Sequence, residues 1–287
     1  MGKTIKGLST MLTDILKPDG TNGMVKGRRG HIVFNRNDMY VGESIKQYGE
    51  YSENEIALFE QLVKPGDQVV DVGANIGTHT LALSQIVTNS GFVFAFEPQA
   101  IVFQILCANM AVNSVINVDC QNLIVSRISG ATTLPRFDYS IQGNYGGVSI
   151  EDHMGEGDRV GVVSLDEYLY DVAKLNFIKV DVEGHELEVL VGATNLIRKF
   201  SPILYVENDK PSKSKDLIEH IDMLGYNMYW HLPKLFNENN FAGKTEDVFD
   251  GCPSINMLCI HKSVKTELDG FARVDDFNFH PCGGEND

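Results

Sequence analysis

The stretch at residues 69–77 constrains this chain most, because it predicts a buried strand that runs straight into a glycine turn. The apolar run at 69–72 is bounded by turn residues, which is typical of a strand buried on both faces of a parallel sheet. Gly73 and Gly77 follow, and helical spacing begins in residues 81–86. A glycine turn between a buried strand and a helix brings backbone N–H groups against a ligand. We therefore expect an α/β sheet with a nucleoside-cofactor site at this turn.

Glu97 is the residue that we expect to bind the ribose of the nucleoside. It closes a second apolar run, 92–96, about twenty positions after the glycine turn, where dinucleotide folds place the acid that binds the ribose hydroxyls. Asn75 stands where the dinucleotide fingerprint has its middle glycine, and the charge of Asp71 at the strand end would repel a diphosphate. A cofactor with an amino group, a sulfonium and no phosphate fits better, and S-adenosyl-L-methionine has these properties.

Five motifs occur in an order that resembles the FkbM-type methyltransferases. They are Asp71-Val-Gly-Ala-Asn-Ile-Gly77, Phe96-Glu97-Pro98, Ser164-Leu-Asp-Glu167, Lys179-Val-Asp-Val-Glu-Gly-His-Glu-Leu-Glu-Val-Leu190 and Tyr205-Val-Glu-Asn208. The resemblance covers roughly residues 48–208. It implies a doubly wound, mostly parallel seven-stranded sheet of the Rossmann-like class I methyltransferase type, with the first and fourth strands adjacent.

The resemblance also implies where the cofactor binds. The segment at 47–51 would fold over the methionine end, and the end of the third strand would lie beside the adenine. The cofactor-binding residues that we expect are Tyr48, Ser52, Asp71, Gly73, Ala74, Asn75, Gly77, Glu97, Pro98, Asn122, Leu123 and Asp181. Ordinary surface or core roles for Tyr48, Asn122 and Leu123 stay open.

Four side chains are candidates for catalysis: Asp181, Glu183, His185 and Glu207. Methyl transfer is an in-line displacement, so the protein mainly aligns the acceptor and excludes water. A hydroxyl acceptor must also lose a proton, for which a base within hydrogen-bonding reach helps. His185 is the candidate whose ordinary pKa lies near neutrality, although a histidine at a helix start is often a solvated surface residue.

Metal binding is an alternative at the same strand ends. Asp181, Glu207 and Asn208 resemble the set that holds magnesium in catechol-type methyltransferases, and hard oxygen ligands suit Mg²⁺. Asp181 can equally line the cofactor pocket, so we expect S-adenosyl-L-methionine as cofactor and no metal.

The expected reaction is O-methylation of a hydroxyl on a small-molecule acceptor such as a sugar or polyketide, a class that the resemblance supplies. N-methylation of an amide in a peptide product is the alternative. An NAD(P)-dependent oxidoreductase is disfavoured by Asn75, and a non-enzymatic cofactor-binding protein by the intact carboxylates at the strand ends.

Charge and composition narrow the partners. The net charge of −15 over 287 residues argues against nucleic acid and against an anionic membrane surface. No apolar run approaches the ~18 residues of a membrane span, and no signal-peptide core is found. The five cysteines show no C-x-x-C spacing, which favours reduced thiols in a cytoplasmic protein. The oligomeric state is left open.

We expect three parts: an N-terminal extension or cap at 1–50, a methyltransferase domain at 51–265 and a C-terminal tail at 266–287. A hairpin is expected to turn at 35–38. The inserted segment 130–163 is expected near the acceptor pocket or as a plain edge hairpin. The polar loop 233–253 has the length of a lid or binding loop. Patterns at Ser52-x-x-Glu55 and Ser164-x-x-Glu167 predict helix starts by capping boxes.

Overall fold

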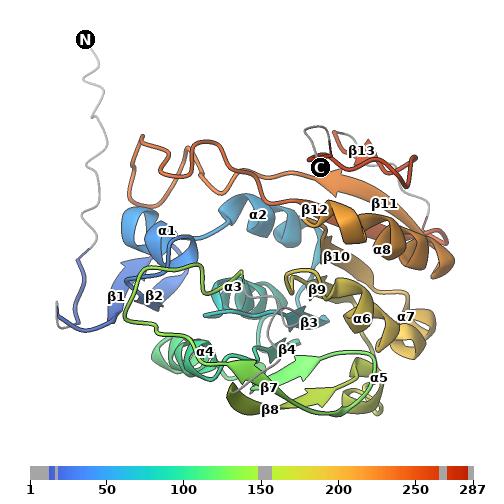
Figure 1. Ribbon diagram of the computed structural model, residues 1–287, viewed down its shortest axis with the longest axis horizontal. Helices are drawn as coiled ribbons and strands as arrows, with labels where there is room; N and C mark the ends of the chain where they lie inside the picture. Colours follow the sequence, from blue (N-terminus) through green and yellow to red (C-terminus); the bar gives the residue numbers. More distant parts are fainter. Residues whose placement is uncertain (1–12, 17–18, 148–156, 265–269, 284–287) are drawn as a thin grey trace.

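The described residues of the computed structural model, 13–16, 19–147, 157–264 and 270–283, form one large sheet with helices on both faces (Figure 1). The strand order is β13-β11-β12-β10-β9-β3-β4-β5. The strands of this sheet are β3 (Gln68–Val72), β4 (Phe92–Phe96), β5 (Val118–Gln121), β9 (Phe177–Val180), β10 (Ile203–Glu207), β11 (Tyr226–His231), β12 (Asn256–His261) and β13 (Ala272–Arg273).

The centre of the sheet confirms the predicted topology. Strands β5, β4, β3, β9 and β10 run parallel, and β12 pairs antiparallel with both β10 and β11. The first and fourth parallel strands in chain order, β3 and β9, are neighbours, so the strand order reverses between them. Ligands of doubly wound sheets bind beyond the carboxyl ends of the strands at such a reversal. A short eighth strand, β13, extends the seven expected, because Arg273 of the expected tail pairs with Tyr229.

Alternation along the strands assigns side chains to the two faces. The face that carries Val69, Val93 and Phe177 is covered by α2, α3 and α4. The opposite face, with Val70 and Ile178, is covered by α5, α6, α7 and α8. The helices are α1 (Val41–Tyr48), α2 (Glu53–Leu62), α3 (Thr78–Val87), α4 (Ala100–Val112), α5 (Leu165–Tyr168), α6 (Glu186–Val191), α7 (Thr194–Phe200) and α8 (Pro211–Met223). Burial of both faces explains why the central strands are apolar runs without alternating polarity.

The N-terminal hairpin differs from its prediction. Strands β1 (Asn22–Gly27) and β2 (Gly30–Asn35) pair antiparallel, so the chain turns at residues 28–29 and not at 35–38. Residues 41–48 form α1, which packs with the hairpin and α4 around Ile45, Phe34 and Val102. Apolar contact with the main domain therefore outweighed the local turn signal. Residues 1–12 and 17–18 of the expected extension lie outside the described residues.

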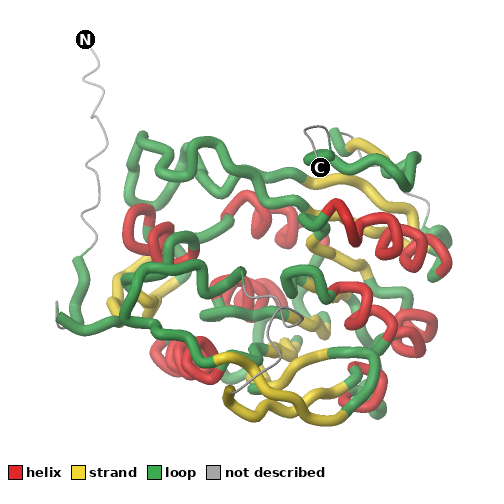
Figure 2. Tube along the Cα trace, viewed as in Figure 1, coloured by secondary structure: helices red, strands yellow, loops and turns green. Residues whose placement is uncertain are grey.

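Two further segments lie over the carboxyl end of the main sheet. In the first, the insertion strands β7 (Gly130–Pro135) and β8 (Gly157–Val163) join β6 (Leu123–Val125), which precedes the insertion, in a separate sheet of order β6-β8-β7. The long connection between β11 and β12 crosses α1 and α2 as loop structure (Figure 2). It is held by the Tyr48 hydroxyl, which donates to the Glu246 carbonyl at 2.8 Å, and by the Asn54 amide, which donates to the Lys234 carbonyl at 2.8 Å.

Among the described residues, no helix combines the length and the apolar character that crossing a bilayer requires.

Candidate active site

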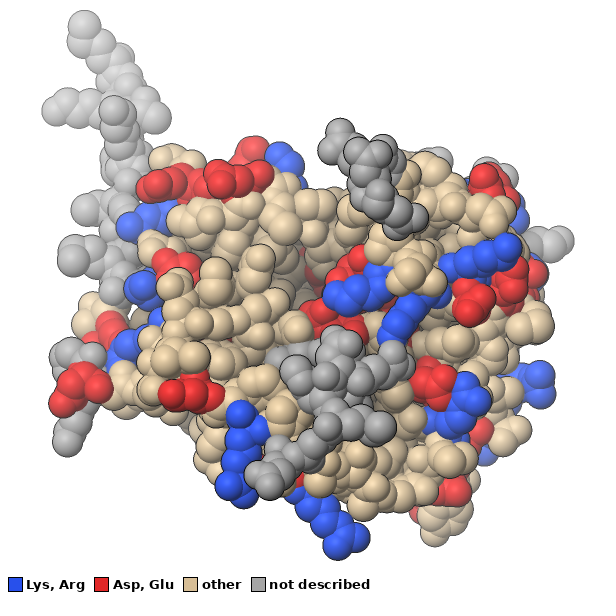
Figure 3. All heavy atoms as spheres, in the orientation of Figure 1, with Lys and Arg blue, Asp and Glu red and all other residues tan. Residues whose placement is uncertain are grey.

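A cavity of about 340 Å³ lies at the carboxyl ends of β3, β9 and β10, at the reversal of strand order. In the space-filling view, Asp and Glu atoms lie in a hollow near the middle of the face, with Lys or Arg atoms beside them (Figure 3). The lining includes Gly73, Ala74, Asn75, Thr78, His79, Glu97, Lys179, Asp181, Glu183, Glu207 and Asp209, together with Tyr40, Tyr51 and Glu55 from the N-terminal part. The cavity thus collects most of the expected strand-end residues in one place.

The glycine turn has a geometry that a side chain would break. Gly73 has φ +78°, and a Cβ added there would lie 1.8 Å from the Asp181 carbonyl oxygen. Gly77 has φ +86°, and its Cβ would lie 2.5 Å from the Leu106 side chain. Asn75 has φ +50°, a conformation that asparagine tolerates better than most residues. The turn therefore presents bare backbone to the cavity, as the spacing of its glycines predicted.

Glu97 is buried beside this turn and holds it in shape. Its carboxylate accepts the backbone N–H of Asn75 at 3.0 Å and that of Gln99 at 2.8 Å. Burial raises the pKa of Glu97 to about 7, against the lowering effect of these two hydrogen bonds. Near neutral pH the group therefore exchanges between carboxyl and carboxylate.

The expected adenine contacts separate from one another. Asn122 lines a second cavity, of about 320 Å³, together with Pro98. Its amide donates to the carbonyl oxygens of Glu97 and Pro98, both at 2.9 Å. Leu123 instead packs in the core beside Val125, because it starts β6 with its side chain toward the α5–α8 face. The structure thus puts Asn122 on a cavity wall and Leu123 behind it.

Asp71 does not reach the cavity, contrary to its predicted cofactor contact. Its side chain is fully buried, and Oδ2 accepts the Thr80 hydroxyl at 2.7 Å. Its Oδ1 lies 3.3 Å from the Lys179 ammonium. Because a lysine neutralises this charge, the repulsion of a diphosphate that the sequence suggested is weakened. Asp71 therefore stabilises the glycine turn from inside the core and does not line the cavity.

Lys179 is the residue that the sequence analysis missed. It alternates onto the same face of β9 as Phe177, lies 3.1 Å from Asp181, and is only 1% exposed. Although burial opposes its charge, the carboxylates of Asp181 and Asp71 raise the pKa of Lys179. A lysine in an otherwise apolar buried strand, between two strand-end acids, was the available signal.

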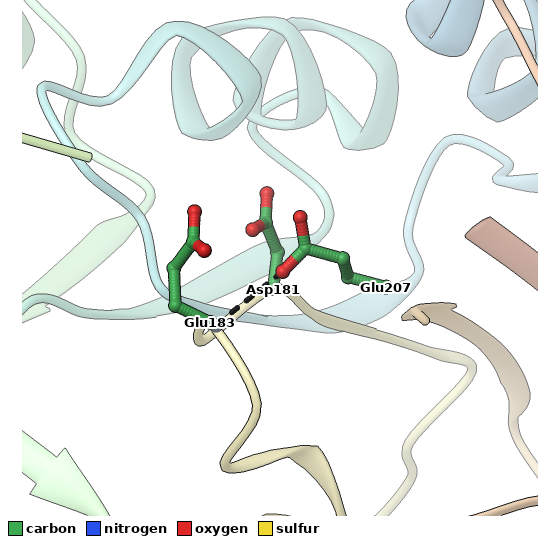
Figure 4. A group of neighbouring side chains, drawn as sticks. All are labelled: Asp181, Glu183 and Glu207. Carbon is green, nitrogen blue, oxygen red and sulfur yellow. Dashed lines mark hydrogen bonds between the residues drawn. The ribbon is translucent and has the colours of Figure 1, made fainter. Parts of the chain in front are cut away.

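Three of the four catalytic candidates converge. One oxygen from each of Asp181, Glu183 and Glu207 lies within 4.8 Å of the others, and Figure 4 shows these carboxyl groups side by side at the ends of β9 and β10. The Glu183 backbone N–H donates to Glu207 Oε2 at 3.3 Å. The three carboxyls therefore repel one another unless a proton or a cation intervenes.

Their protonation states differ for physical reasons. Burial, and then the charges of Asp181 and Glu183, raise the pKa of Glu207 well above its ordinary value. Burial also acts to raise the pKa of Asp181, but the Lys179 ammonium holds it below the ordinary value. Burial raises the pKa of Glu183, and Lys210, at 2.9 Å, opposes that rise. Of the three, Asp181 thus most favours the charged form and Glu207 the protonated form.

Asn208 leaves the set considered for magnesium. Its amide donates to Ser214 Oγ at 2.9 Å and to Met257 Sδ at 3.4 Å. Ser214 belongs to α8, so Asn208 faces the opposite side of the sheet from Glu207, its neighbour along the chain. The predicted trio of Asp181, Glu207 and Asn208 does not meet at one point.

His185 also lies elsewhere. Its Nε2 is 3.0 Å from Ser126 Oγ, and the ring lines a small cavity beside β6, β7 and β8. Glu183 and Gly184 both have positive φ, so the chain reverses before His185 and carries it away from Asp181. The histidine on the wall of the main cavity is His79, in the first turn of α3.

The segment expected to fold over the methionine end contributes different residues from those predicted. Tyr48 is buried between Phe236 and Phe249 of the β11–β12 connection, and its hydroxyl accepts the Val248 N–H at 2.9 Å. Ser52 has φ +49°, and its hydroxyl donates to the Glu55 carboxylate at 2.8 Å, so it does not form the predicted capping box. Tyr40 and Tyr51 face the cavity instead. The other box is partly confirmed, since Ser164 accepts the Glu167 N–H.

The insertion and the long connection both reach the cavity. Asn144, Gly146 and Gly147 line it, and a Cβ on Gly146 would lie 2.7 Å from the Asn75 amide. Leu235 and residues 252–255 line the side near β10. Residues 148–156 of the insertion lie outside the described part of the chain.

Comparison with known proteins gives a consistent assignment. The methyltransferase FkbM domain matches residues 71–228. The hexuronic acid methyltransferase AglP of Haloferax volcanii is 35% identical over 153 residues, which are 52% of this chain and 59% of the relative, so the chain spans about three fifths of that relative's length.

Solved structures give weaker matches. The methyltransferase FkbM from Methylobacillus flagellatus has a TM-score of 0.44 at 17% identity, covering 72% of this chain and 50% of that one. Aeropyrum pernix fibrillarin with bound S-adenosyl-L-methionine has a TM-score of 0.42 at 14% identity, covering 87% and 99%. The assignment therefore rests on the domain match, which takes in more than half of the chain from the buried strand β3 to β11. The protein belongs to the methyltransferases of the FkbM domain family.

Proposed function

We propose that this protein transfers a methyl group from S-adenosyl-L-methionine to a hydroxyl of a sugar. One observation carries the proposal. In a chain of this family, one cavity at the reversal of strand order is lined on one side by the glycine turn and Glu97. On the other side it is lined by the cluster of three carboxylates, Asp181, Glu183 and Glu207.

The residues present suit the cofactor. The bare backbone at Gly73 allows close approach, and the Glu97 carboxylate offers acceptors for ribose hydroxyls. Asp181 stays charged beside Lys179, and a carboxylate favours a positively charged ligand such as a sulfonium. When bound, the cofactor supplies an activated methyl group. The chain must orient the acceptor, exclude water and take up one proton.

The sugar acceptor is proposed from the relative, which is named for acting on hexuronic acid. Polar side chains at the cavity suit a polyhydroxylated molecule: Tyr40, Tyr51, Asn144 and Asp209. The net charge of −15 disfavours a nucleic-acid acceptor.

We further propose that the reaction proceeds without magnesium. Lys179 lies 3.1 Å from Asp181 and Lys210 lies 2.9 Å from Glu183, so two of the three carboxylates already have a cation partner. A proton on Glu207 relieves the remaining repulsion.

We keep the division into an N-terminal cap at 1–50, a catalytic domain at 51–265 and a tail at 266–287 as a proposal. All five cysteines lie in the described ranges and are free thiols, which supports a reducing compartment such as the cytoplasm.

Three measurements test the function. Calorimetry with S-adenosylhomocysteine is expected to give a dissociation constant in the micromolar range, and NAD(P)H is expected not to bind. Mass spectrometry would then follow a gain of one methyl on a panel of neutral, amino and hexuronic acid glycosides, with and without EDTA, and NMR would locate the methylated atom. No affinity for S-adenosylhomocysteine would overturn the proposed cofactor. A methyl group on nitrogen would overturn the proposed O-methylation, and a loss of rate in EDTA would overturn the proposal that the reaction needs no magnesium.

A further inference from the structure

A histidine and a glutamate face the cavity and have no part in the function proposed above. Glu55, in the first turn of α2, and His79, in the first turn of α3, are 3% and 5% exposed. Glu55 Oε2 lies 3.6 Å from His79 Nε2. This separation is just beyond hydrogen-bonding distance, and catalytic hydrogen bonds are often long before substrate binds.

Polar side chains that lie in the apolar core surround the carboxylate of Glu55. Its Oε1 accepts the Ser52 hydroxyl at 2.8 Å. The Tyr205 hydroxyl lies near enough to its carboxylate that burial, and then the Glu55 charge, raise the pKa of Tyr205. Tyr205 is buried and lies 2.8 Å from His231 Nδ1. Tyr205 lies within the apolar cluster that contains Phe59, Phe177 and Leu258. Polar side chains inside such a cluster cost free energy unless they are satisfied, so their alignment on Glu55 indicates that its position matters.

The surroundings of His79 favour the neutral ring. Burial lowers the pKa of His79, and the nearby charge of Lys179 acts in the same direction. The carboxylates of Glu55, Asp71 and Asp181 oppose this lowering without overcoming it. A neutral histidine with one nitrogen directed at a carboxylate carries its proton on that nitrogen. Here the nitrogen that faces Glu55 is Nε2, which is buried and has no hydrogen-bond partner in the described part of the chain, so a proton on Nε2 would leave Nδ1 with a free electron pair.

The other acidic groups of the cavity are less suited to accept a proton. Asp181 is paired with Lys179, and Glu183 with Lys210. Burial and the neighbouring carboxylates raise the pKa of Glu207 well above its ordinary value, which favours its protonated form. Glu97 accepts two backbone N–H groups at the glycine turn. Nδ1 of His79 makes no hydrogen bond to any described residue.

We propose that His79 is the general base that removes the proton from the acceptor hydroxyl, and that Glu55 is its positioning residue. The inference rests on the proposed O-methylation. The acceptor oxygen bonds to the methyl carbon, the carbon–sulfur bond breaks with its electron pair left on sulfur, and the hydroxyl proton moves to Nδ1. The imidazolium that forms is stabilised by the Glu55 carboxylate and later loses its proton to solvent.

The first test needs no acceptor. Nitrogen-15 NMR of histidine-labelled protein, with S-adenosylhomocysteine added, is expected to show His79 neutral at pH 7 with the proton on Nε2. His79→Gln assigns the signal, and His220→Gln, on α8 and outside the cavity, is the matched control. Glu55→Gln should lower the pKa of His79 further, because a carboxylate that raises it is lost. A proton on Nδ1 in the wild type would overturn the proposal, whether or not an acceptor is known.

The second test uses a glycoside that the wild type methylates. His79→Gln is expected to lower kcat about 10²–10⁴-fold, to keep the dissociation constant of S-adenosylhomocysteine within threefold, and to remove the acid limb of the pH–rate profile. Glu55→Gln should move that limb to lower pH, which a merely structural role would not do. His220→Gln should keep the wild-type profile.

Two outcomes would contradict the proposal in the second test. A kcat of His79→Gln within threefold of the wild-type value would show that His79 is not the general base. A more than tenfold loss of S-adenosylhomocysteine affinity at unchanged kcat makes His79 a cofactor contact instead. Should His79→Gln unfold, the NMR result on the wild type and on Glu55→Gln decides. Failure of the wild type to bind S-adenosylhomocysteine would count against the proposed function and leaves the tautomer measurement interpretable.

Discussion

The two walls of the cavity are built by different means. The first, made of Gly73, Ala74, Asn75 and Glu97 and here named the nucleoside wall, is shaped by backbone: positive φ angles and two N–H groups on one carboxylate. The second, made of Asp181, Glu183 and Glu207 and here named the carboxylate wall, is shaped by charges whose states depend on one another and on Lys179. The nucleoside wall should therefore be sensitive to added side-chain volume, and the carboxylate wall to changes of charge.

The largest expected effect comes where the two walls touch. Gly73→Ala places a Cβ 1.8 Å from the Asp181 carbonyl oxygen, so β3 and β9 must move apart. We expect a loss of at least about 4 kcal/mol in the free energy of unfolding and loss of S-adenosylhomocysteine binding. Urea unfolding and calorimetry measure both.

Gly66→Ala is the matched control for that collision. Gly66 also has positive φ, but its Cβ would meet only Ser90, with Oγ at 3.6 Å and the carbonyl oxygen at 4.0 Å. It should lose about 1 kcal/mol. Equal losses in the two variants would show that backbone conformation, and not contact between the walls, is what Gly73 provides.

Charge under the carboxylate wall gives the next effect. Lys179→Met leaves the buried Asp71 and the partly exposed Asp181 without their cation, and we expect a loss of about 3 kcal/mol at pH 7, mostly from Asp71. The loss should shrink as the pH falls and the carboxylates protonate. The double variant Asp71→Asn with Lys179→Met should recover part of it, because it removes one unpaired charge. A double variant no more stable than the single one contradicts this account.

Glu97→Gln tests the nucleoside wall by titration. The pKa of Glu97 is about 7 in the fold against 4.5 for the ordinary group. A raised pKa of this kind gives stability that is present below pH 4.5 and is lost as the pH rises to about 7, by about 3 kcal/mol. The ligand-free wild type should therefore lose more stability across this window than Glu97→Gln does.

The same group should make cofactor affinity depend on pH in the opposite direction. Ribose hydroxyls bond best to the ionised carboxylate, so S-adenosylhomocysteine should bind about tenfold more tightly at pH 8 than at pH 6. Glu97→Gln should bind about tenfold more weakly at pH 8 and lose this dependence. Calorimetry at both pH values measures it, and an unchanged slope in the variant would place the titrating group elsewhere.

The smallest effect is expected at His185, which lies on neither wall. Its ring contacts Ser126 beside the insertion sheet. His185→Gln should change kcat by less than about twofold, against the large loss expected for His79→Gln. A large loss in His185→Gln would return the catalytic histidine to the position that its motif suggested.

Much of the nucleoside wall could be predicted from the sequence because its determinants are local. A buried strand, glycines that need positive φ and an acid at the next strand end occupy short stretches, and their geometry follows from residue type. The adjacency of β3 and β9 came from the resemblance and is confirmed by their pairing. The carboxylate wall was predicted in membership but not in protonation state, since each pKa depends on residues distant along the chain.

By itself, the sequence determined the layered α/β fold and the glycine turn, since apolar periodicity and the positions of the glycines suffice for these. The resemblance to the family supplied the strand order that brings Asp181, Glu183 and Glu207 together. Only the tertiary structure decided that Asp71 is buried against Lys179, that Asn208 faces α8, and that His79 rather than His185 reaches the cavity. The reason is direction. A side chain's face follows from strand parity and from the positive-φ turn at residues 183–184, and what lies on that face is set by packing between distant segments.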